Sequence, residues 1–399
     1  MDLSVDREYE SYRGEVRSFL AEHWPANAGG AARPDRQALR RFLGAATEAG
    51  YIYRNIPRQY GGGECPIDPH EASIIKEEFS RAGAPTDLTG MGRLVIPALL
   101  GYGSEEQKQR FIRGTLLGDI AWCQGFSEPG AGSDLAAVST KARLVDGEWV
   151  INGQKIWTSY AHLADYMFAL VRTEPDAPKH QGISYLLIEL NQPGVEIRPL
   201  RQMTGEANFN EVFLTDARTP ADMIVGARGE GWKVKSATLK AERTGSAGEP
   251  SMALFRRVLA LAQHRERFGR PALEDAEVRQ WLASLEASAL AHLYSGHRML
   301  ARDAKGEDAG LFPLMNKLYS TECFGMEAAR IARELIGDDG LLLAPPRGVR
   351  DWPRTDRPVG DETWNSTALT LLSNLIAGGT SNIQRNIISE RGYGLPREA

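Results

Sequence analysis

The chain has 399 residues, of which 42% are hydrophobic and 25% are charged, and its formal net charge is −5. A single hydrophobic core stops growing at about 250–300 residues, so this length predicts two or three domains. The acidic balance argues against a nucleic-acid partner, and no apolar run reaches the roughly 20 residues that a membrane-spanning helix needs. The N-terminus lacks the apolar segment of a secretory signal, and the three cysteines lack metal-ligand spacing. We therefore expect a cytoplasmic protein with reduced thiols, no membrane span and no metal site.

Residues 1–117 are predicted to form an N-terminal α-helical domain. Apolar side chains recur at helical spacing around Val16, around Leu39, and over residues 71–82 and 105–117. Segments rich in glycine and proline, at residues 60–63 and 66–69, separate these stretches.

Residues 118–228 are predicted to form a middle antiparallel β domain, either a barrel or a sandwich. Asp146-Gly147 and Asn152-Gly153 are typical of two-residue hairpin turns. Short segments rich in branched and aromatic residues follow at 166–171, 183–190, 195–200 and 211–214. Their spacing is typical of a compact β domain that ends near residue 226.

Residues 229–399 are predicted to form a C-terminal α-helical bundle, with helices at 232–267, 274–305, 314–336 and 366–390. Pro250 lies inside the first of these, so we expect a bend or a break around Gly248-Glu249-Pro250. Helices, a β domain and helices again define an α+β fold class.

The segment Gln124-Gly-Phe-Ser-Glu-Pro-Gly-Ala-Gly-Ser-Asp134 is the first candidate for a binding site. Its proline and glycines prevent a helix or a central strand, and they leave backbone N–H groups free to bind phosphate or carbonyl oxygens. Ser127 and Ser133 add hydroxyls, and Trp157-Thr-Ser159 follows 23 residues after Asp134. The pattern favours a planar ligand with a phosphate group, and the alternative is a surface turn.

Four further segments, together with this loop, resemble the acyl-CoA dehydrogenase family over essentially the whole chain. They are Asn152-Gly-Gln-Lys-Ile-Trp157, Arg265-Glu-Arg-Phe-Gly269, Gly379-Thr-Ser-Asn-Ile-Gln-Arg385 and Glu390-Arg-Gly-Tyr-Gly-Leu-Pro396. The resemblance implies an acyl-CoA dehydrogenase-like fold, with FAD between the β domain and the helical bundle. It implies FAD contacts at Phe126, Ser127, Gly132, Ser133, Trp157, Ser159, Arg265, Phe268, Thr380 and Asn382. Arg265 and Phe268 match residues that reach the FAD of a neighbouring subunit, and Ser133 matches a residue at the substrate mouth.

Four positions depart from the family pattern, and the first is Gln124, which stands where an aromatic residue is common. Arg267 stands where a small hydroxyl residue is common, and Glu334 and Asp338 occupy a segment that usually carries an amide and glycines. An acid near phosphate is unfavourable unless it points away or pairs with an arginine such as Arg267 or Arg333. These departures fit a hetero-oligomer in which a partner supplies part of each site, and a homotetramer is the alternative.

The chemistry that the resemblance implies needs a carboxylate near the carbon α to a thioester. A proton leaves that carbon while a hydride leaves the β carbon for flavin N5, and donors stabilise the enolate charge on the thioester oxygen. Most relatives carry the carboxylate where this chain has Gly378. Relatives of the isovaleryl-CoA type and of the bacterial steroid and branched-chain type carry it on an earlier helix, which matches Leu239-Lys-Ala-Glu242-Arg243.

We therefore expect Glu242 to be the base, Gly378 to donate its backbone N–H to the thioester oxygen, and Arg243 to position the substrate or the base. The alternative for Glu242 is a solvated helix residue. The missing side chain at Gly378 leaves room for a branched or bulky acyl group, including a polycyclic one. The resemblance also implies an acyl-CoA or acyl-ACP substrate and an electron-transferring flavoprotein as partner.

Two other functions remain open on the same scaffold. One is a non-catalytic FAD-binding subunit of a hetero-oligomeric acyl-CoA dehydrogenase, and the other is a flavin oxidase or monooxygenase. His162 follows the Trp157 segment and is interpreted as a loop residue rather than a flavin contact.

Overall fold

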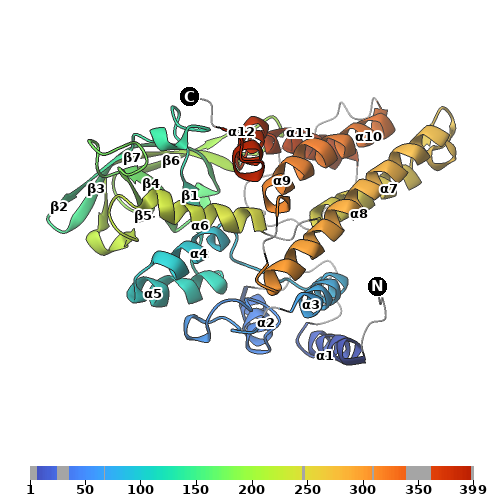
Figure 1. The fold of residues 1–399 in the computed structure, drawn as a ribbon, viewed down its shortest axis with the longest axis horizontal. Coiled ribbons are helices and arrows are strands. Elements are labelled where there is room, and N and C mark those ends of the chain that lie inside the picture. The colour runs from blue at the N-terminus through green and yellow to red at the C-terminus, as the bar shows by residue number, and fades with distance from the viewer. Residues whose placement is uncertain are drawn as a thin grey trace. The chain divides into compact units, whose positions relative to one another are not determined.

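The computed structural model describes residues 7–24, 36–66, 68–244, 248–307, 310–337 and 361–396. It divides into two compact units. Unit 1 comprises Met1–Arg198 and Asn210–Ala241, and unit 2 comprises Pro199–Phe209 and Glu242–Ala399. Helices, then a sheet, then helices follow along the chain, which confirms the predicted α+β fold class (Figure 1).

The helices of unit 1 that precede the sheet are α1 (Arg7–His23), α2 (Arg36–Glu48), α3 (Pro69–Ala82), α4 (Gly92–Tyr102) and α5 (Glu105–Leu116). Their ends follow local chemistry, since Asp68 caps α3 and Ser104 forms a capping box with Gln107 at the start of α5. The sequence interpretation missed α4. Gly92, Pro97 and Gly101 suggest a loop, but the apolar residues between them are buried and tertiary packing stabilises the helix.

The sheet contains eight strands in the order β6-β7-β3-β2-β4-β5-β8, and β1 pairs in parallel with β4 off that path. The strands are β1 (Trp122–Gly125), β2 (Lys141–Val145), β3 (Glu148–Ser159), β4 (Tyr166–Arg172), β5 (Ile183–Glu189), β6 (Val195–Leu200), β7 (Phe209–Pro220) and β8 (Ile224–Val225). The β domain is antiparallel at the β2–β3, β4–β5 and β5–β8 pairs, as predicted, and it also contains parallel β1–β4 and β2–β4 pairs that the sequence interpretation did not include. The β1–β4 pairing places the start of the Gln124–Asp134 loop, at the end of β1, beside the buried middle of β4.

One of the two predicted hairpin turns was wrong. Asp146-Gly147 does turn the chain between β2 and β3, with φ angles of 50° and 83°. Asn152-Gly153 instead lies within β3, where Asn152 pairs with Lys141 of the neighbouring strand. Glycine is required there by close approach, since a Cβ on Gly153 would lie 2.5 Å from Thr140 Oγ1.

The helix α6 (Gly231–Thr244) follows the sheet, and unit 2 continues with helices α7 (Glu249–Gln263), α8 (Ala276–Ala304), α9 (Phe312–Leu318), α10 (Met326–Ile336), α11 (Asp361–Asn374) and α12 (Ser381–Ile387). π-helical segments at Tyr319–Gly325 and Ile388–Gly392 extend α9 and α12. Buried apolar residues of α7, α8 and α10 form the core of unit 2, together with Trp364 of α11. The expected interruption before α7 is confirmed, because Gly248 has φ 94° and Pro250 lies in the first helical turn.

Two predicted helices of unit 2 were too long. The helix predicted to reach residue 267 ends at Gln263, and the chain enters a hairpin of β9 (Glu266–Arg267) and β10 (Arg270–Pro271). The helix predicted over 366–390 is interrupted between α11 and α12, because Gly378 and Gly379 take φ angles of 65° and 94°. Both interruptions bring candidate site residues into turns.

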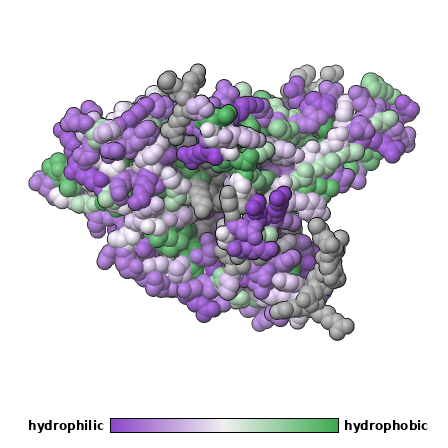
Figure 2. Space-filling view, in the orientation of Figure 1, coloured by the Kyte–Doolittle hydropathy of each residue, from purple (hydrophilic) through white to green (hydrophobic). Residues whose placement is uncertain are grey.

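The face of the molecule shown in Figure 2 is mainly hydrophilic, with hydrophobic residues in scattered patches. No helix among the described residues is long and apolar enough to cross a membrane.

Candidate functional site

The structure brings the Gln124–Asp134 loop and the end of β3 side by side in unit 1. Ile156 N–H donates to the carbonyl oxygen of Ser127 at 3.0 Å. Glu128 and Ala131 exchange two backbone hydrogen bonds, at 3.0 and 3.1 Å, which close the loop around Pro129 and Gly130. Two segments that were selected separately in the sequence therefore form one continuous surface.

A buried ion pair fixes this arrangement, and the sequence interpretation did not identify it. Lys155 is fully buried, and its Nζ donates to Glu128 Oε1 at 2.7 Å, to the Leu170 carbonyl at 2.6 Å and to the Phe126 carbonyl at 3.4 Å. Glu128 also accepts from Ser139 N–H, Ser139 Oγ and Thr140 N–H. In the sequence, this pair is visible only as Glu128 within the Gln124–Asp134 segment and Lys155 within the Asn152–Trp157 segment.

The pair is charged near neutral pH. Burial opposes the ionisation of Glu128, but the charge and hydrogen bonds of Lys155 outweigh it and lower the pKa of this carboxyl to about 2. Burial lowers the pKa of the Lys155 ammonium to about 8 despite the opposing effect of Glu128. The hydrogen bonds of Lys155 tie Phe126 and Glu128, at the start of the loop, to β3 and β4.

Trp157 is in an unusual conformation at the end of β3. Its φ angle is 58°, in the left-handed region, and its side chain is 59% exposed. A bulky residue in this region is strained, and such strain concentrates at binding and catalytic sites. Ser159 is half-buried two residues further on. An exposed indole beside a hydroxyl provides an apolar face and a polar contact for a planar ligand.

The four predicted contacts within the loop differ in exposure. Gly132 and Ser133 are exposed and Ser127 is half-buried. A Cβ on Gly132 would meet nothing within 4 Å, so space is open next to the backbone there. The ring of Phe126 is instead buried between Phe168 and Tyr185, with both centroids at 5.9 Å, so this side chain supports the loop from the core.

His162 lies in a short 3-10 turn that follows β3. The Asn210 side chain donates to the Thr158 carbonyl at 2.9 Å, so its oxygen faces His162 Nδ1 at 3.0 Å and the proton of the ring is on Nδ1. Among the described residues, His162 Nε2 and Thr158 Oγ1 are buried without a hydrogen-bond partner. The contacts that the structure shows for His162 therefore brace the strand end that carries Trp157.

The segment with Arg265 and Phe268 forms the β9–β10 hairpin of unit 2. Phe268 has φ 54° and is 80% exposed, a second large aromatic side chain in the left-handed region. Arg267 pairs with Asp275 at 3.2 Å and with Glu277 at 2.7 Å. Glu334 is exposed on α10, and Asp338 lies outside the described residues.

Glu242 and Arg243 belong to the last turn of α6. Over residues 231–239 of this helix, where burial is described, the buried residues Gly231, Val234 and Thr238 follow helical spacing. Thr238 Oγ1 lies 3.1 Å from the hydroxyl of the buried Tyr185. Glu242 is four residues after Thr238, which is one turn further along the same helix face. The periodicity therefore places Glu242 on the face whose preceding residues are buried.

Gly378 lies in the turn between α11 and α12, and no carboxylate occupies residues 377–380. Among the described residues, no hydrogen-bond partner is present for the Gly378 N–H. Thr380 caps α12 by accepting from Ile383 N–H at 3.3 Å, and Asn382 is exposed in the first turn of that helix. The turn thus combines an available backbone donor with two of the predicted cofactor contacts.

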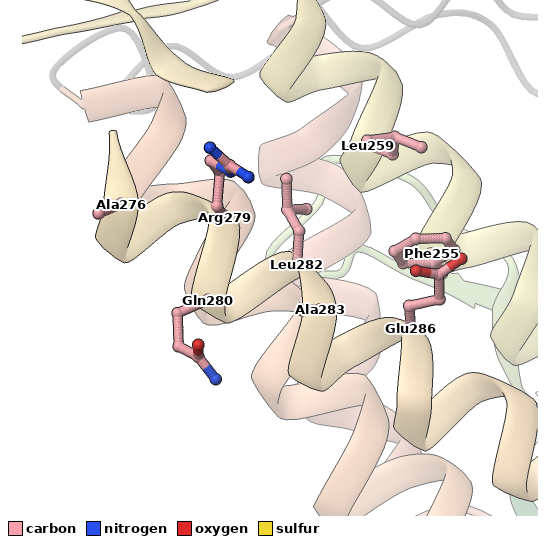
Figure 3. Close-up of a pocket in the computed structure, with 8 residues that line it drawn as sticks. All are labelled: Phe255, Leu259, Ala276, Arg279, Gln280, Leu282, Ala283 and Glu286. Carbon is pink, nitrogen blue, oxygen red and sulfur yellow. The ribbon is translucent and has the colours of Figure 1, made fainter. Parts of the chain in front are cut away.

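The described residues contain a groove that is separate from the predicted site residues. A groove of about 550 Å³ runs between α7 and α8 (Figure 3), and none of the predicted site residues lines it. Its walls are formed by Phe255, Leu259, Ala276, Arg279, Gln280, Leu282, Ala283 and Glu286. Within the described part of the chain, no group of three or more His, Cys, Asp or Glu residues could hold a metal ion.

Comparison with known proteins gives consistent matches along the chain. Residues 6–119, 123–217 and 229–393 match the family models "Acyl-CoA dehydrogenase, N-terminal domain", "middle domain" and "C-terminal domain". The acyl-CoA dehydrogenase IpdE1 of Mycobacterium tuberculosis is 37% identical over 412 residues, which cover 98% of this chain and 99% of that protein.

Solved structures agree with these matches. The ChsE4-ChsE5 complex from Mycobacterium tuberculosis matches with a TM-score of 0.76 and 28% identity, over 100% of both chains. A structure titled "Tcur3481-Tcur3483 steroid ACAD" matches with a TM-score of 0.76 and 29% identity, again over 100% of both chains.

Proposed function

The chain belongs to the acyl-CoA dehydrogenase family and is an acyl-CoA dehydrogenase, an oxidoreductase. We propose that it uses FAD to introduce an α,β double bond into a bulky acyl-CoA thioester, with Glu242 as the base. The observation that carries the proposal is the contrast between positions 378 and 242. The turn at Gly378 has no carboxylate, and Glu242 follows the buried Thr238 of α6 by one helical turn.

The residues present fit FAD. In unit 1 an exposed, strained Trp157 and the hydroxyl of Ser159 stand next to an open glycine-rich loop with the hydroxyls of Ser127 and Ser133. An isoalloxazine ring needs an apolar face with a few polar contacts, and a pyrophosphate needs backbone donors and hydroxyls. When bound, FAD supplies the hydride acceptor of the reaction. Arg265, Phe268, Thr380 and Asn382 complete the proposed cofactor contacts.

Glu242 takes the proton from the carbon α to the thioester. A general base must lie within reach of the proton that it removes, and a carboxylate at this position of α6 is proposed to fill that role. A second carboxylate at position 378 would repel it, and glycine there avoids that conflict. Arg243, the next residue on α6, positions the substrate or the base.

Gly378 stabilises the charge that develops on the thioester oxygen. Its N–H has no partner among the described residues, so it is available to the substrate. A backbone donor that is already in place needs no reorganisation when charge appears, and one such donor typically contributes a factor of about 100–1,000 to a rate. The absence of a side chain leaves the donor unchanged and widens the space for the acyl group.

The proposed acyl group is branched or bulky. Support comes from glycine at position 378 and from the similarity to a structure whose title names a steroid ACAD. The carrier is CoA or, alternatively, an acyl-carrier protein, and an electron-transferring flavoprotein is the proposed electron acceptor in the cytoplasm.

We propose a hetero-oligomer as the assembly, with a homotetramer as the alternative. One similar structure is titled as a complex of two named proteins. Phe268 and its hairpin are exposed, which suits a side chain that reaches the cofactor of a neighbouring subunit.

The decisive experiment is anaerobic mixing of the FAD-loaded protein with a panel of acyl thioesters while flavin absorbance is followed. Glu242→Gln should retain FAD and bind thioester but lose flavin reduction by about 1,000-fold or more, because the proton acceptor is gone. Glu286→Gln, an exposed glutamate of α8, is the matched control and should reduce flavin at the wild-type rate. Normal reduction by Glu242→Gln would show that another group is the base.

The alternative is a non-catalytic subunit. It is supported by the two similar structures, each of which carries the names of two proteins, ChsE4-ChsE5 and Tcur3481-Tcur3483. It requires that the purified chain shows no flavin reduction with any thioester until a partner chain is co-expressed. A flavin oxidase or monooxygenase would instead consume oxygen rapidly once reduced, which an oxygen electrode measures in the same preparation.

A further inference from the structure

The turn between α11 and α12 is held from inside by the side chain of Gln384. This residue of α12 is only 1% exposed, and its Nε2 donates to the Gly378 carbonyl oxygen at 3.0 Å. The amide packs so closely that a Cβ on Gly379 would lie 2.7 Å from Nε2. The second glycine of the turn is therefore required by the contact with Gln384 as well as by its φ of 94°.

The chain before and after the glycines is also anchored. Ala377 N–H donates to the Ser373 carbonyl at 3.0 Å, and the Leu375 carbonyl accepts from Ser381 N–H at 3.2 Å. The same carbonyl accepts from Lys317 Nζ of α9 at 3.3 Å. These bonds fix the peptide that precedes Ala377 and tie the end of α11 to the start of α12.

Between the anchors, two successive glycines would be free to change conformation, since glycine has the widest range of backbone angles. The bond from Gln384 fixes the peptide that follows Gly378, and the bond to Ser373 fixes the peptide that precedes Ala377. The peptide between them carries the Gly378 N–H. The orientation of the Ala377–Gly378 peptide is therefore set largely by the buried side-chain amide of Gln384, which lies next to it, and not by the glycines themselves.

We propose that Gln384 is a positioning residue, which aims the Gly378 N–H at the oxygen of the thioester. This inference rests on the proposed function, in which that N–H stabilises enolate charge. A donor stabilises a developing oxyanion only in a narrow range of distance and angle, so a turn that samples several conformations loses part of the effect. Loss of the Gln384 bond should lower the rate of flavin reduction by about tenfold, with FAD still bound.

The test compares Gln384→Met with Asn386→Met. Methionine has a similar length but no donor, and Asn386 is an exposed residue of the same helix, so its variant is the matched control. The probe is acetoacetyl-CoA, whose bound enolate gives a charge-transfer band with oxidised flavin. Gln384→Met should raise the apparent pKa of the bound probe by about one unit, which is the same tenfold effect. FAD content and melting temperature should stay within the range of Asn386→Met.

Gly379→Ala is a second, independent variant, since its Cβ displaces the Gln384 amide while the amide itself remains. It should shift the pKa of the probe in the same direction. Wild-type values in both variants would overturn the proposal, and so would loss of FAD or of the fold in both, which would assign Gln384 a structural role.

The probe needs no turnover, so this measurement is separate from the test of Glu242. A wild-type protein that no thioester reduces contradicts the proposed function. A wild-type protein that is reduced normally, with a Gln384→Met variant that is equally fast and binds the probe equally, contradicts this inference alone.

Discussion

Replacing Lys155 with methionine tests the role of the buried ion pair beneath the Gln124–Asp134 loop. The change removes the cation but keeps a long unbranched side chain of similar shape. It deletes the 2.7 Å bond to Glu128 and the 2.6 Å bond to the Leu170 carbonyl. The Glu128 side chain is only 3% exposed, so its charge cannot be hydrated without opening the loop.

The expected cost follows from what remains around Glu128. Removing one partner of a buried ion pair destabilises a protein by about 3–5 kcal/mol, because the other charge stays buried. Glu128 retains three donors, two from Ser139 and one from Thr140, so we expect the lower end, about 3 kcal/mol. For a unit of about 150–250 residues, this corresponds to a fall of about 6–12 °C in melting temperature.

The pH dependence gives an independent check with a defined sign. In the wild type, the pKa of Glu128 is lowered from 4.5 to about 2, so its contribution is complete above about pH 4.5 and is lost as the pH falls toward 2. Without Lys155 this pKa rises, and protonation relieves the buried charge at a higher pH. The difference in melting temperature between wild type and Lys155→Met should therefore shrink as the pH falls from 7 to 4.

Thermal melting followed by circular dichroism at pH 7 and pH 4 measures both effects. The double variant Glu128→Gln/Lys155→Met removes both charges and should recover part of the loss, since no buried charge is left unpaired. A melting temperature of Lys155→Met within 2 °C of the wild type would refute this account. So would a double variant whose loss equals the sum of the two single losses.

Three further changes test other parts of the structure. Trp157→Asn should reduce FAD retention severalfold. The stability of the FAD-free protein should change by less than about 1 kcal/mol, because asparagine tolerates the left-handed conformation that tryptophan resists. An FAD content equal to that of the wild type after gel filtration would count against the flavin site. Gly153→Ala should lose about 1–3 kcal/mol in urea unfolding because its Cβ meets Thr140, whereas Gly14→Ala, with nothing within 4 Å, should lose none. Burial lowers the pKa of His292 despite its hydrogen bond to Asn316, so the stability of the protein should fall as the pH drops below about 6.5. In melting curves from pH 7.5 to 5.5, His292→Gln should reduce the dependence of the melting temperature on pH.

The elements with regular periodicity were predictable from the sequence. The helices α3 and α5, most of the strands of the sheet, and the break before α7 follow from apolar spacing and from proline and glycine. The helix α4 was not predictable, because its glycines and proline oppose a helix and only burial of its apolar residues favours one. Asn152-Gly153 has the composition of a turn, but its pairing with β2 and the approach of Thr140 decide for a strand.

The sequence by itself predicted the fold class, and its resemblance to a known family indicated the family and the residues that are proposed for binding and catalysis. The fold class follows from apolar periodicity and from turn residues, whereas the family and the proposed site residues follow from the resemblance of five segments. The buried pair Glu128–Lys155, the left-handed conformation of Trp157 and the contact between Gln384 and Gly378 were decided only by the tertiary structure. Each depends on groups that the chain brings together from different elements, and burial gives those contacts their energy.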